Sequence, residues 1–385
     1  MRERKTAIVL GGGVGGLVAA NRLRRLLPAR HRVVLVERAR QHLFQPSLLW
    51  LAVGDRTADQ IRRPLAQLVR RGVEVRIGAI ERIDAAARTV FIDGEPLHGD
   101  ALVIALGADL APEAIPGLAP AGHDLYNLDG ASAFREALGA FTKGRLVILT
   151  AAPAYKCPAA PYEAAMLIEA HLRHRGVREG VQLDLYAAEP GPMGVTGPKV
   201  SGQVRGVVES KGIRYHPDHQ VTQVDPTARR LSFSNGATAD FDLLLYVPPH
   251  RAPAVVREAG LVGPSGWVTV DRHTLATPID GVYAIGDVTG IPLAMGKPLP
   301  KAGAFAHAQG EVVAHNIADA WANRSPRRSF DGHGQCFLET GDGRAGYGAG
   351  NFYAEPTPQV ALHPPALWWH WGKVLFERRW LRRWT

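Results

Sequence analysis

The chain is poor in cysteine and has no long hydrophobic run. Among its 385 residues only Cys157 and Cys336 are cysteines, which excludes a framework of structural disulfides. No stretch of about 18 apolar residues occurs, so no transmembrane helix is expected. The amino terminus is charged and runs straight into a strand, unlike a secretory leader. We therefore expect a reducing cytoplasmic setting, where two cysteines suit catalysis better than structure.

The length and composition favour a globular protein of two or three domains. Hydrophobic residues make up 46% of the chain and charged residues 21%, which is ordinary for such a protein. The net charge is +9, and nearly half of it lies in residues 366–385. A basic excess suits an anionic membrane, an acidic partner or nucleic acid. No nucleic-acid-binding module or metal-ligating cluster accompanies it, so neither partner is expected.

Two β-α-β patterns organise the sequence. Residues 6–10 form an apolar strand, followed by a glycine run, a helix and a second strand at residues 32–37. The pattern recurs with strands near residues 146–150 and 182–186 and a helix between them. The prediction is an α/β fold with two Rossmann-like domains of the FAD/NAD(P)-binding type and a C-terminal membrane-interface segment. The predicted units are an FAD-binding domain (1–112 and 241–323), a second Rossmann-like domain (113–240) and a C-terminal region (324–385).

The first glycine run has the form of a dinucleotide-binding turn. Gly11-x-Gly13-x-x-Gly16 follows a strand and opens a helix, which is the context that this fingerprint requires. The glycines let the backbone approach a pyrophosphate, and the helix amino terminus offers free N–H groups. Glu37 ends the next strand, where a carboxylate can accept hydrogen bonds from ribose hydroxyls. A dinucleotide is therefore predicted here.

Two later segments favour FAD over NAD as that dinucleotide. Ala105-Leu106-Gly107 ends one strand and Tyr283-Ala284-Ile285-Gly286-Asp287 ends another. The pair resembles the second and third signatures of the FAD-binding, disulfide-reductase-like flavoproteins. That resemblance implies that Asp287 holds the ribitol chain of FAD. It also implies that the helix after Lys301 points its amino end at the flavin, where its dipole stabilises negative charge.

The second domain lacks the glycine fingerprint that NADH would need. Its first strand is followed by Ala151-Ala152-Pro153-Ala154-Tyr155-Lys156-Cys157-Pro158. Prolines and larger side chains stand where a pyrophosphate requires bare backbone. We predict that the nicotinamide site has been lost and that the electron donor is something else.

Each cysteine has a distinct local setting. Cys157 lies beside Lys156 and just before a helix, and both neighbours favour the reactive thiolate. Cys336 lies on a short strand-like segment. Taken singly, each is more often a buried apolar thiol.

These segments together resemble the sulfide:quinone oxidoreductases and the flavoprotein of flavocytochrome c sulfide dehydrogenase. The motifs are the FAD signatures, Phe44-Gln45-Pro46, Lys156-Cys157-x-x-Ala160-Pro161, Pro300-Lys301 and Cys336-Phe337. The resemblance implies a Cys157–Cys336 redox pair that sulfide opens, with electrons passing to FAD and then to quinone. It further implies cofactor contacts at Gly11, Gly13, Val14, Gly15, Gly16, Glu37, Arg38, Gln45, Pro46, Ile80, Ala105, Gly107, Gly286, Asp287, Lys301, Ala302 and Gly303.

The sequence departs from this family at two positions. Many members have a third cysteine where this chain reads Leu125-Tyr126-Asn127. The flavocytochrome relatives tether the flavin through a cysteine in the region of His42. We therefore expect non-covalent FAD. Glu163 and nearby histidines are candidate bases without a firm assignment, and His307 is expected to be packed.

The last twenty residues combine five tryptophans with five basic residues. Such a mixture favours the boundary of an anionic bilayer. Because the apolar positions do not follow one helical face and Gly372 interrupts them, two short segments are expected. They would place a quinone pocket at the lipid, lined by Phe337, Tyr347, Phe352 and Tyr353. Packing on the protein or in a homo-oligomer interface is the alternative.

The resulting hypothesis is a sulfide:quinone oxidoreductase that is peripheral on the cytoplasmic side of the cell membrane. Three alternatives stay open. They are a sulfide dehydrogenase flavoprotein with a cytochrome acceptor, an NADH:quinone oxidoreductase, and a flavoprotein redox sensor that binds a partner without turnover.

Overall fold

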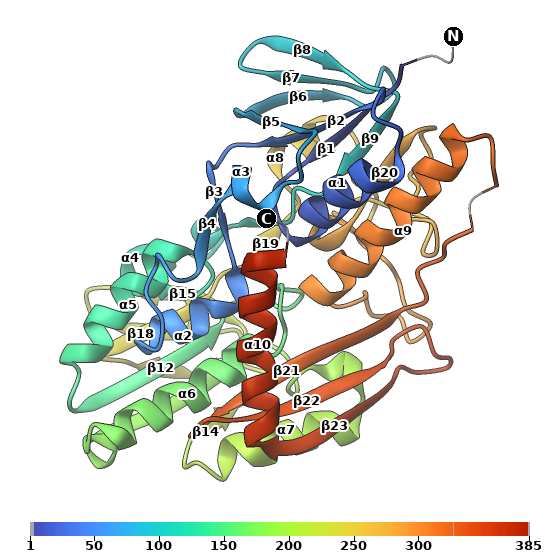
Figure 1. Ribbon diagram of the computed structural model, residues 1–385. Coiled ribbons are helices and arrows are strands. Elements are labelled where there is room, and N and C mark those ends of the chain that lie inside the picture. Colours follow the sequence, from blue (N-terminus) through green and yellow to red (C-terminus); the bar gives the residue numbers. More distant parts are fainter. Residues whose placement is uncertain (1–3, 326, 384–385) are drawn as a thin grey trace.

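The computed structural model describes residues 4–325 and 327–383. The first layer of the fold is a parallel β-sheet (Figure 1). The order is β20-β9-β1-β2-β5, with β1 at the centre because its residues are almost all buried and apolar. Helices α1 and α9 pack together against this sheet. The bounds are β1 (Thr6–Leu10), β2 (Arg32–Glu37), β5 (Val73–Ile77), β9 (Ala101–Ile104), β20 (Val282–Ala284), α1 (Val14–Leu26) and α9 (Gly303–Trp321).

A second parallel sheet has the order β11-β18-β12-β13-β14. Its central strand β12 is apolar, and the first two turns of helix α6 are almost wholly buried. The bounds are β11 (His123–Asp124), β12 (Gly144–Thr150), β13 (Val181–Ala187), β14 (Arg214–His216), β18 (Leu243–Val247), α5 (Leu128–Ala140), α6 (Ala160–His174) and α7 (Pro198–Glu209). The predicted fold class and both β-α-β units are confirmed.

The predicted domain boundary at residue 241 is wrong. Strand β18 pairs with β12 in the second sheet, so the second domain extends through Val247. The return to the first domain follows at β19 (His250–Arg251), which pairs with β10 (Asp109–Leu110). An apolar strand does not reveal from its own sequence which of two sheets it joins, because both sheets bury such strands.

Small antiparallel sheets and short helices fill the remaining connections. The sheets are β6-β7-β8, β15-β16-β17 and β3-β4. Their bounds are β3 (Gln41–Leu43), β4 (Arg62–Pro64), β6 (Ile80–Asp84), β7 (Thr89–Ile92), β8 (Glu95–His98), β15 (Val221–Asp225), β16 (Arg230–Phe233) and β17 (Thr238–Asp240). The short α-helices are α2 (Leu48–Ala52), α3 (Leu65–Leu68), α4 (Leu118–Ala121) and α8 (Ala254–Glu258).

The C-terminal region is an antiparallel sheet crossed by one helix (Figure 1). Strands β21 (His333–Gly341), β22 (Arg344–Asn351) and β23 (Gln359–Ala366) lead into α10 (Leu367–Arg383). The expectation of two short segments is wrong, because α10 runs unbroken through Gly372. Phe337 packs against the space that a side chain at Gly372 would fill. Within residues 4–325 and 327–383, no helix combines the length and apolar character needed to cross a bilayer.

Candidate active site

The glycine turn between β1 and α1 has the geometry of a dinucleotide cradle. A side chain at Gly16 would lie 1.8 Å from the carbonyl oxygen of Gly11, and one at Gly11 would lie 2.4 Å from that of Ala105. Only glycine fits these two positions. Gly13 faces open space, with no atom within 4 Å of the point where a Cβ would lie, and α1 begins immediately after it. The bare backbone and the helix amino terminus therefore fit a pyrophosphate.

Asp287 and Lys301 form the second part of the cofactor site. Lys301 donates from its buried ammonium to the carbonyl oxygens of Asp287 (2.6 Å) and Thr289 (3.0 Å). Burial lowers the pKa of Lys301 to about 8, although Asp287 opposes this shift. Among the described residues, the Asp287 carboxylate makes no hydrogen bond, so it is available to a ligand hydroxyl. Gln309, which the sequence did not indicate, accepts a hydrogen bond from the Gly286 backbone N–H (2.7 Å) and fixes this turn.

The remaining predicted cofactor residues come from several elements, and the structure joins some of them to the glycine turn or to the Cys157 loop. The Glu37 carboxylate accepts a hydrogen bond from the Gly12 backbone N–H (2.6 Å), so it lies at the cradle. Gln45, followed by Pro46 in a short 3₁₀ turn, accepts a hydrogen bond from Lys156 at 2.9 Å. Val14 and Gly15 lie at the start of α1, and the exposed Arg38 follows β2. Ile80 is the first residue of β6, and Gly107 lies after β9. Ala302 precedes α9, and Gly303 is its first residue.

The Cys157 loop is bound directly to the Lys301 loop. The Cys157 backbone N–H donates to the Lys301 carbonyl oxygen at 2.6 Å, and Lys156 pairs with Lys301 in a parallel bridge. Cys157 has a φ of +48°, which is unfavourable for a residue with a side chain. Tyr126 donates its hydroxyl to the Cys157 carbonyl oxygen at 3.1 Å. Tyr126 therefore helps to fix the Cys157 backbone.

The structure brings the two cysteines into one electrostatic environment. Both are free thiols in the described residues. Burial raises the pKa of Cys157 to about 12, and the Glu163 carboxylate adds to this shift. Burial also raises the pKa of Cys336 well above its usual range, and the Cys157 charge raises it further. The charges of Lys156 and Cys157 interact favourably, as expected from the sequence, and Lys373, which the sequence did not indicate, favours the thiolates of both cysteines.

A buried ion pair from two distant parts of the chain lies beside these thiols. Lys373 on α10 donates to the Glu163 carboxylate on α6 at 2.5 Å, and the same carboxylate accepts the Glu339 backbone N–H at 2.9 Å. Glu163 is 2% exposed, and burial raises its pKa despite the opposing effect of Lys373. Burial would lower the pKa of Lys373, but Glu163 and Glu339 together raise it. Lys373 did not appear among the sequence candidates because the pattern of its helix predicted a membrane role alone.

Helix α10 is also fixed to the cofactor domain. Glu377 accepts hydrogen bonds from Arg56 (2.8 Å) and Ser47 (2.6 Å). Trp380 donates its indole N–H to His42 (3.2 Å), whose other ring nitrogen lies 2.9 Å from the carbonyl oxygen of Gly12. His307 packs against the Trp380 ring, in line with the packing role expected from the sequence. Helix α10 is therefore a surface helix that is also hydrogen-bonded to the cofactor domain through Arg56, Ser47 and His42.

The four aromatic residues predicted to line a quinone pocket fall into two groups. Phe337 and Tyr347 lie together, with ring centroids 5.3 Å apart, and Tyr347 stacks on Trp369 of α10. Phe352 instead packs on Phe305, and Tyr353 packs on Phe330. Phe376 of α10, which the sequence did not indicate, is exposed and lies 5.8 Å from the Phe44 ring beside Gln45.

In the second domain, the acidic residue after β13 is bound by three hydroxyl groups of the chain. Glu189 follows β13 much as Glu37 ends β2. Its carboxylate accepts hydrogen bonds from Tyr155, from Tyr162 (3.1 Å) and from Thr150 (3.0 Å). An acidic group in this place binds ribose in dinucleotide enzymes. Here three hydroxyl groups of the chain already use it, which supports the predicted loss of the nicotinamide site.

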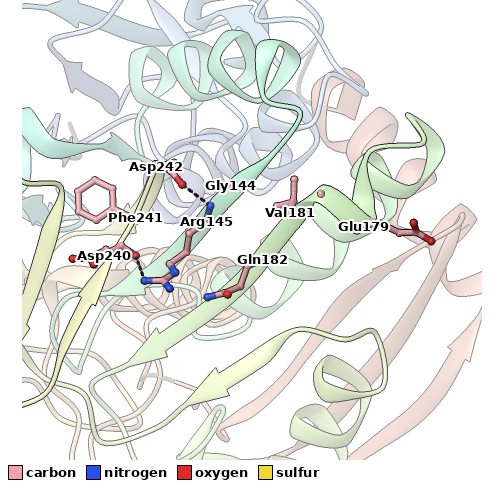
Figure 2. A pocket seen from close by; sticks show the side chains of 9 residues that line it. Gly144, Arg145, Glu179, Val181, Gln182, Asp240, Phe241 and Asp242 are labelled. Carbon is pink, nitrogen blue, oxygen red and sulfur yellow. Dashed lines mark hydrogen bonds between the residues drawn. The ribbon is translucent and has the colours of Figure 1, made fainter.

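One hollow lies away from this chemistry. It has a volume of about 540 Å³ and is lined by Arg145, Gln182 and Asp240 among others (Figure 2). The Arg145 backbone N–H donates to Asp242 (2.7 Å), and its guanidinium donates to the Asp240 carbonyl oxygen (3.1 Å). The hollow opens at the amino ends of β12 and β13, whereas ligands of parallel sheets bind at the carboxyl ends.

Comparison with known proteins decides the family. Residues 5–310 match the family model described as pyridine nucleotide-disulphide oxidoreductase. The chain belongs to this family. A pyridine nucleotide-disulphide oxidoreductase of this kind is an FAD-dependent oxidoreductase, and the site above fits FAD.

Similar proteins extend the likeness to nearly the whole chain. The mitochondrial sulfide:quinone oxidoreductase of Mus musculus is 26% identical, covering 91% of this chain and 78% of its own. The sulfide-quinone reductase of Aquifex aeolicus is also 26% identical, covering 98% and 90%. The crystal structure of the sulfide:quinone oxidoreductase from Aquifex aeolicus superposes with a TM-score of 0.89, 27% identity and coverage of 99% and 92%. The resemblance predicted from the sequence is therefore confirmed.

Proposed function

We propose that this chain is a sulfide:quinone oxidoreductase that binds peripherally to the cytoplasmic face of a membrane. The observation that carries the proposal is the joining of the Cys157 loop to the Lys301 loop, with Cys336 and the Glu163–Lys373 pair beside it. The cysteine loop therefore contacts the loop that is proposed to bind the cofactor. The likeness to sulfide:quinone oxidoreductases supports the same function.

The chain's own residues provide what the sulfide half of the reaction requires. Cys157, which is half-buried, and Cys336, which lies on an exposed part of β21, supply two sulfur atoms whose charges interact. Lys373 favours the thiolate of each, whereas Glu163 opposes it, so the pair sets how easily a thiolate forms. When bound, FAD supplies a two-electron acceptor between sulfur and quinone. The glycine turn, Asp287 and Lys301 would hold it without a covalent bond, because the ring nitrogens of His42 are already engaged by Gly12 and Trp380.

The exposed face of α10 is the surface through which we propose that the protein binds the membrane. Five large apolar side chains are exposed on it, followed towards the carboxyl end by exposed arginines. Such a surface suits the headgroup boundary of an anionic bilayer. Phe376 belongs to this face, and two further aromatic residues, Phe337 and Tyr347, pack against α10. We therefore place the quinone beside α10, near Phe44 and Gln45. The exposed apolar residues are Leu367, Trp368, Trp371, Leu375 and Phe376.

The proposed function predicts fast flavin bleaching by sulfide. Anaerobic stopped-flow absorbance of the purified, FAD-loaded protein should show reduction by sulfide and reoxidation by decylubiquinone. NADH should leave the flavin oxidised, because Tyr155, Tyr162 and Thr150 occupy Glu189. Bleaching by NADH with no response to sulfide would reject the proposal in favour of an NADH:quinone oxidoreductase. Bleaching by sulfide without reoxidation by quinone would direct the search to a cytochrome acceptor.

Membrane binding should depend on the exposed tryptophans of α10. Trp368 and Trp371 have exposed fractions of 68% and 62%. Replacing both with serine is expected to weaken binding to phosphatidylglycerol vesicles at least about tenfold, because two large apolar contacts are lost. Flotation assays would measure this. The control is Arg205→Gln, an exposed charge change on α7. Unchanged flotation of the tryptophan variant would show that α10 does not contact lipid.

A further inference from the structure

The buried ion pair beside the cysteines continues towards the surface through two further titratable groups. Glu339 is 1% exposed, and its carboxylate oxygens lie 3.0 Å and 3.2 Å from Nδ1 of His370. The His370 side chain is 22% exposed, and its ring neighbours the exposed Trp371. Two carboxylates, one ammonium and one imidazole thus extend from the thiols to the protein surface.

The spacing along α10 explains part of this arrangement. Strand β21 carries Cys336 and Glu339, whose side chains point to opposite faces of the strand because they are three residues apart, whereas α10 carries both His370 and Lys373. Residues three apart on a helix share a face, so α10 presents an imidazole and an ammonium to β21 together. Lys373 lies close enough to both Glu163 and Glu339 for each carboxylate to raise its pKa.

The hydrogen-bond geometry places these groups next to one another. Glu163 accepts from Lys373 and from the Glu339 backbone N–H, and the Glu339 carboxylate lies within hydrogen-bonding distance of the His370 ring. Other charged or titratable groups near His370 are Asp55 and Arg56 beyond α2, His171 on α6, and Lys373 and Glu377 on its own helix.

We propose that Glu339 and His370 form the proton exit of the cysteine site, an inference that rests on the proposed function. Hydrosulfide attack on a Cys157–Cys336 disulfide breaks one S–S bond and forms another, giving a persulfide and a thiolate without net electron loss. The persulfide S–H then loses its proton. Formation of an S–S bond between the persulfide sulfur and the remaining thiolate would release two electrons, for which bound FAD would be the acceptor. The Glu163–Lys373 pair receives that proton, and Glu339 and His370 transfer it to solvent. Both are positioning residues, because neither contacts the sulfur atoms.

The test compares His370→Gln with wild type in the full-length, FAD-loaded protein. Glutamine retains a hydrogen-bonding side chain but cannot take up a proton. We expect sulfide-driven flavin reduction to slow at least about tenfold, its rise with pH between about 6 and 8 to flatten, and its solvent deuterium isotope effect to grow. Added imidazole should restore part of the rate. Reoxidation by decylubiquinone should change less than about twofold.

The matched control is His174→Gln, which removes another histidine paired with a carboxylate, Asp342, at 3.1 Å on the surface. It should match wild type throughout. Glu339→Gln is the second variant and should reproduce the flattened pH profile if FAD content is retained. Wild-type kinetics and no imidazole effect in a FAD-loaded His370→Gln protein would overturn the inference. If sulfide fails to bleach wild type, the proposed function fails and this inference falls with it.

Discussion

Cys336→Ser and Cys157→Ser are each expected to abolish flavin reduction by sulfide, by at least about a thousandfold. A serine hydroxyl cannot form the S–S bonds through which sulfide would enter. The two positions come from the loop before α6 and from β21, and they lie near enough for the Cys157 charge to raise the pKa of Cys336. Single-turnover stopped-flow absorbance with sulfide would measure the loss.

The control for this prediction separates chemistry from cofactor binding. Both variants should retain FAD, because the glycine turn and Asp287 do not depend on the thiols. After photoreduction of the flavin, decylubiquinone should reoxidise both variants at a rate within about twofold of wild type. Sulfide bleaching at the wild-type rate in either variant would remove that cysteine from the mechanism.

Lys373→Met is expected to destabilise the folded protein by about 3–5 kcal/mol, the usual cost of leaving one member of a buried ion pair unpaired. Lys373 and Glu163 are both buried and lie 2.5 Å apart. The loss should be larger at about pH 8 than at about pH 5. Burial raises the pKa of Glu163 in the fold, and removing Lys373 raises it further. A neutral carboxyl is therefore tolerated at low pH, whereas stability falls as pH rises above the unfolded-state pKa. Thermal unfolding of the FAD-loaded protein at both pH values would measure this.

The double variant Glu163→Gln/Lys373→Met provides the matched comparison. It removes both charges, so it should recover most of the stability lost in the single variant. Recovery would assign the loss to the unpaired carboxylate rather than to the shape of methionine. Equal stability of Lys373→Met and wild type at the higher pH would contradict the importance of the pair.

The cofactor half of the site could be read from the sequence because its parts are local. A glycine turn, the strand before it and the helix after it are contiguous, and their physical requirements leave few alternatives at Gly11 and Gly16. Strand and helix positions in both Rossmann-like units followed from apolar runs of the right length. The boundary near residue 241 was missed because sheet membership of β18 depends on pairing with β12, which is distant in sequence.

The sequence by itself determined the fold class and the glycine turn, since both depend on residue type and short-range spacing. The proposed roles of the two cysteines came from the family resemblance. Only the tertiary structure decided how α10 is used. Its sequence shows only an apolar and basic segment without one clean helical face, whereas in the fold Lys373, Glu377 and Trp380 turn inward to Glu163, Arg56 and His42. Those partners lie hundreds of residues away, and a buried charge reveals its partner only when folding brings both into one low-dielectric site.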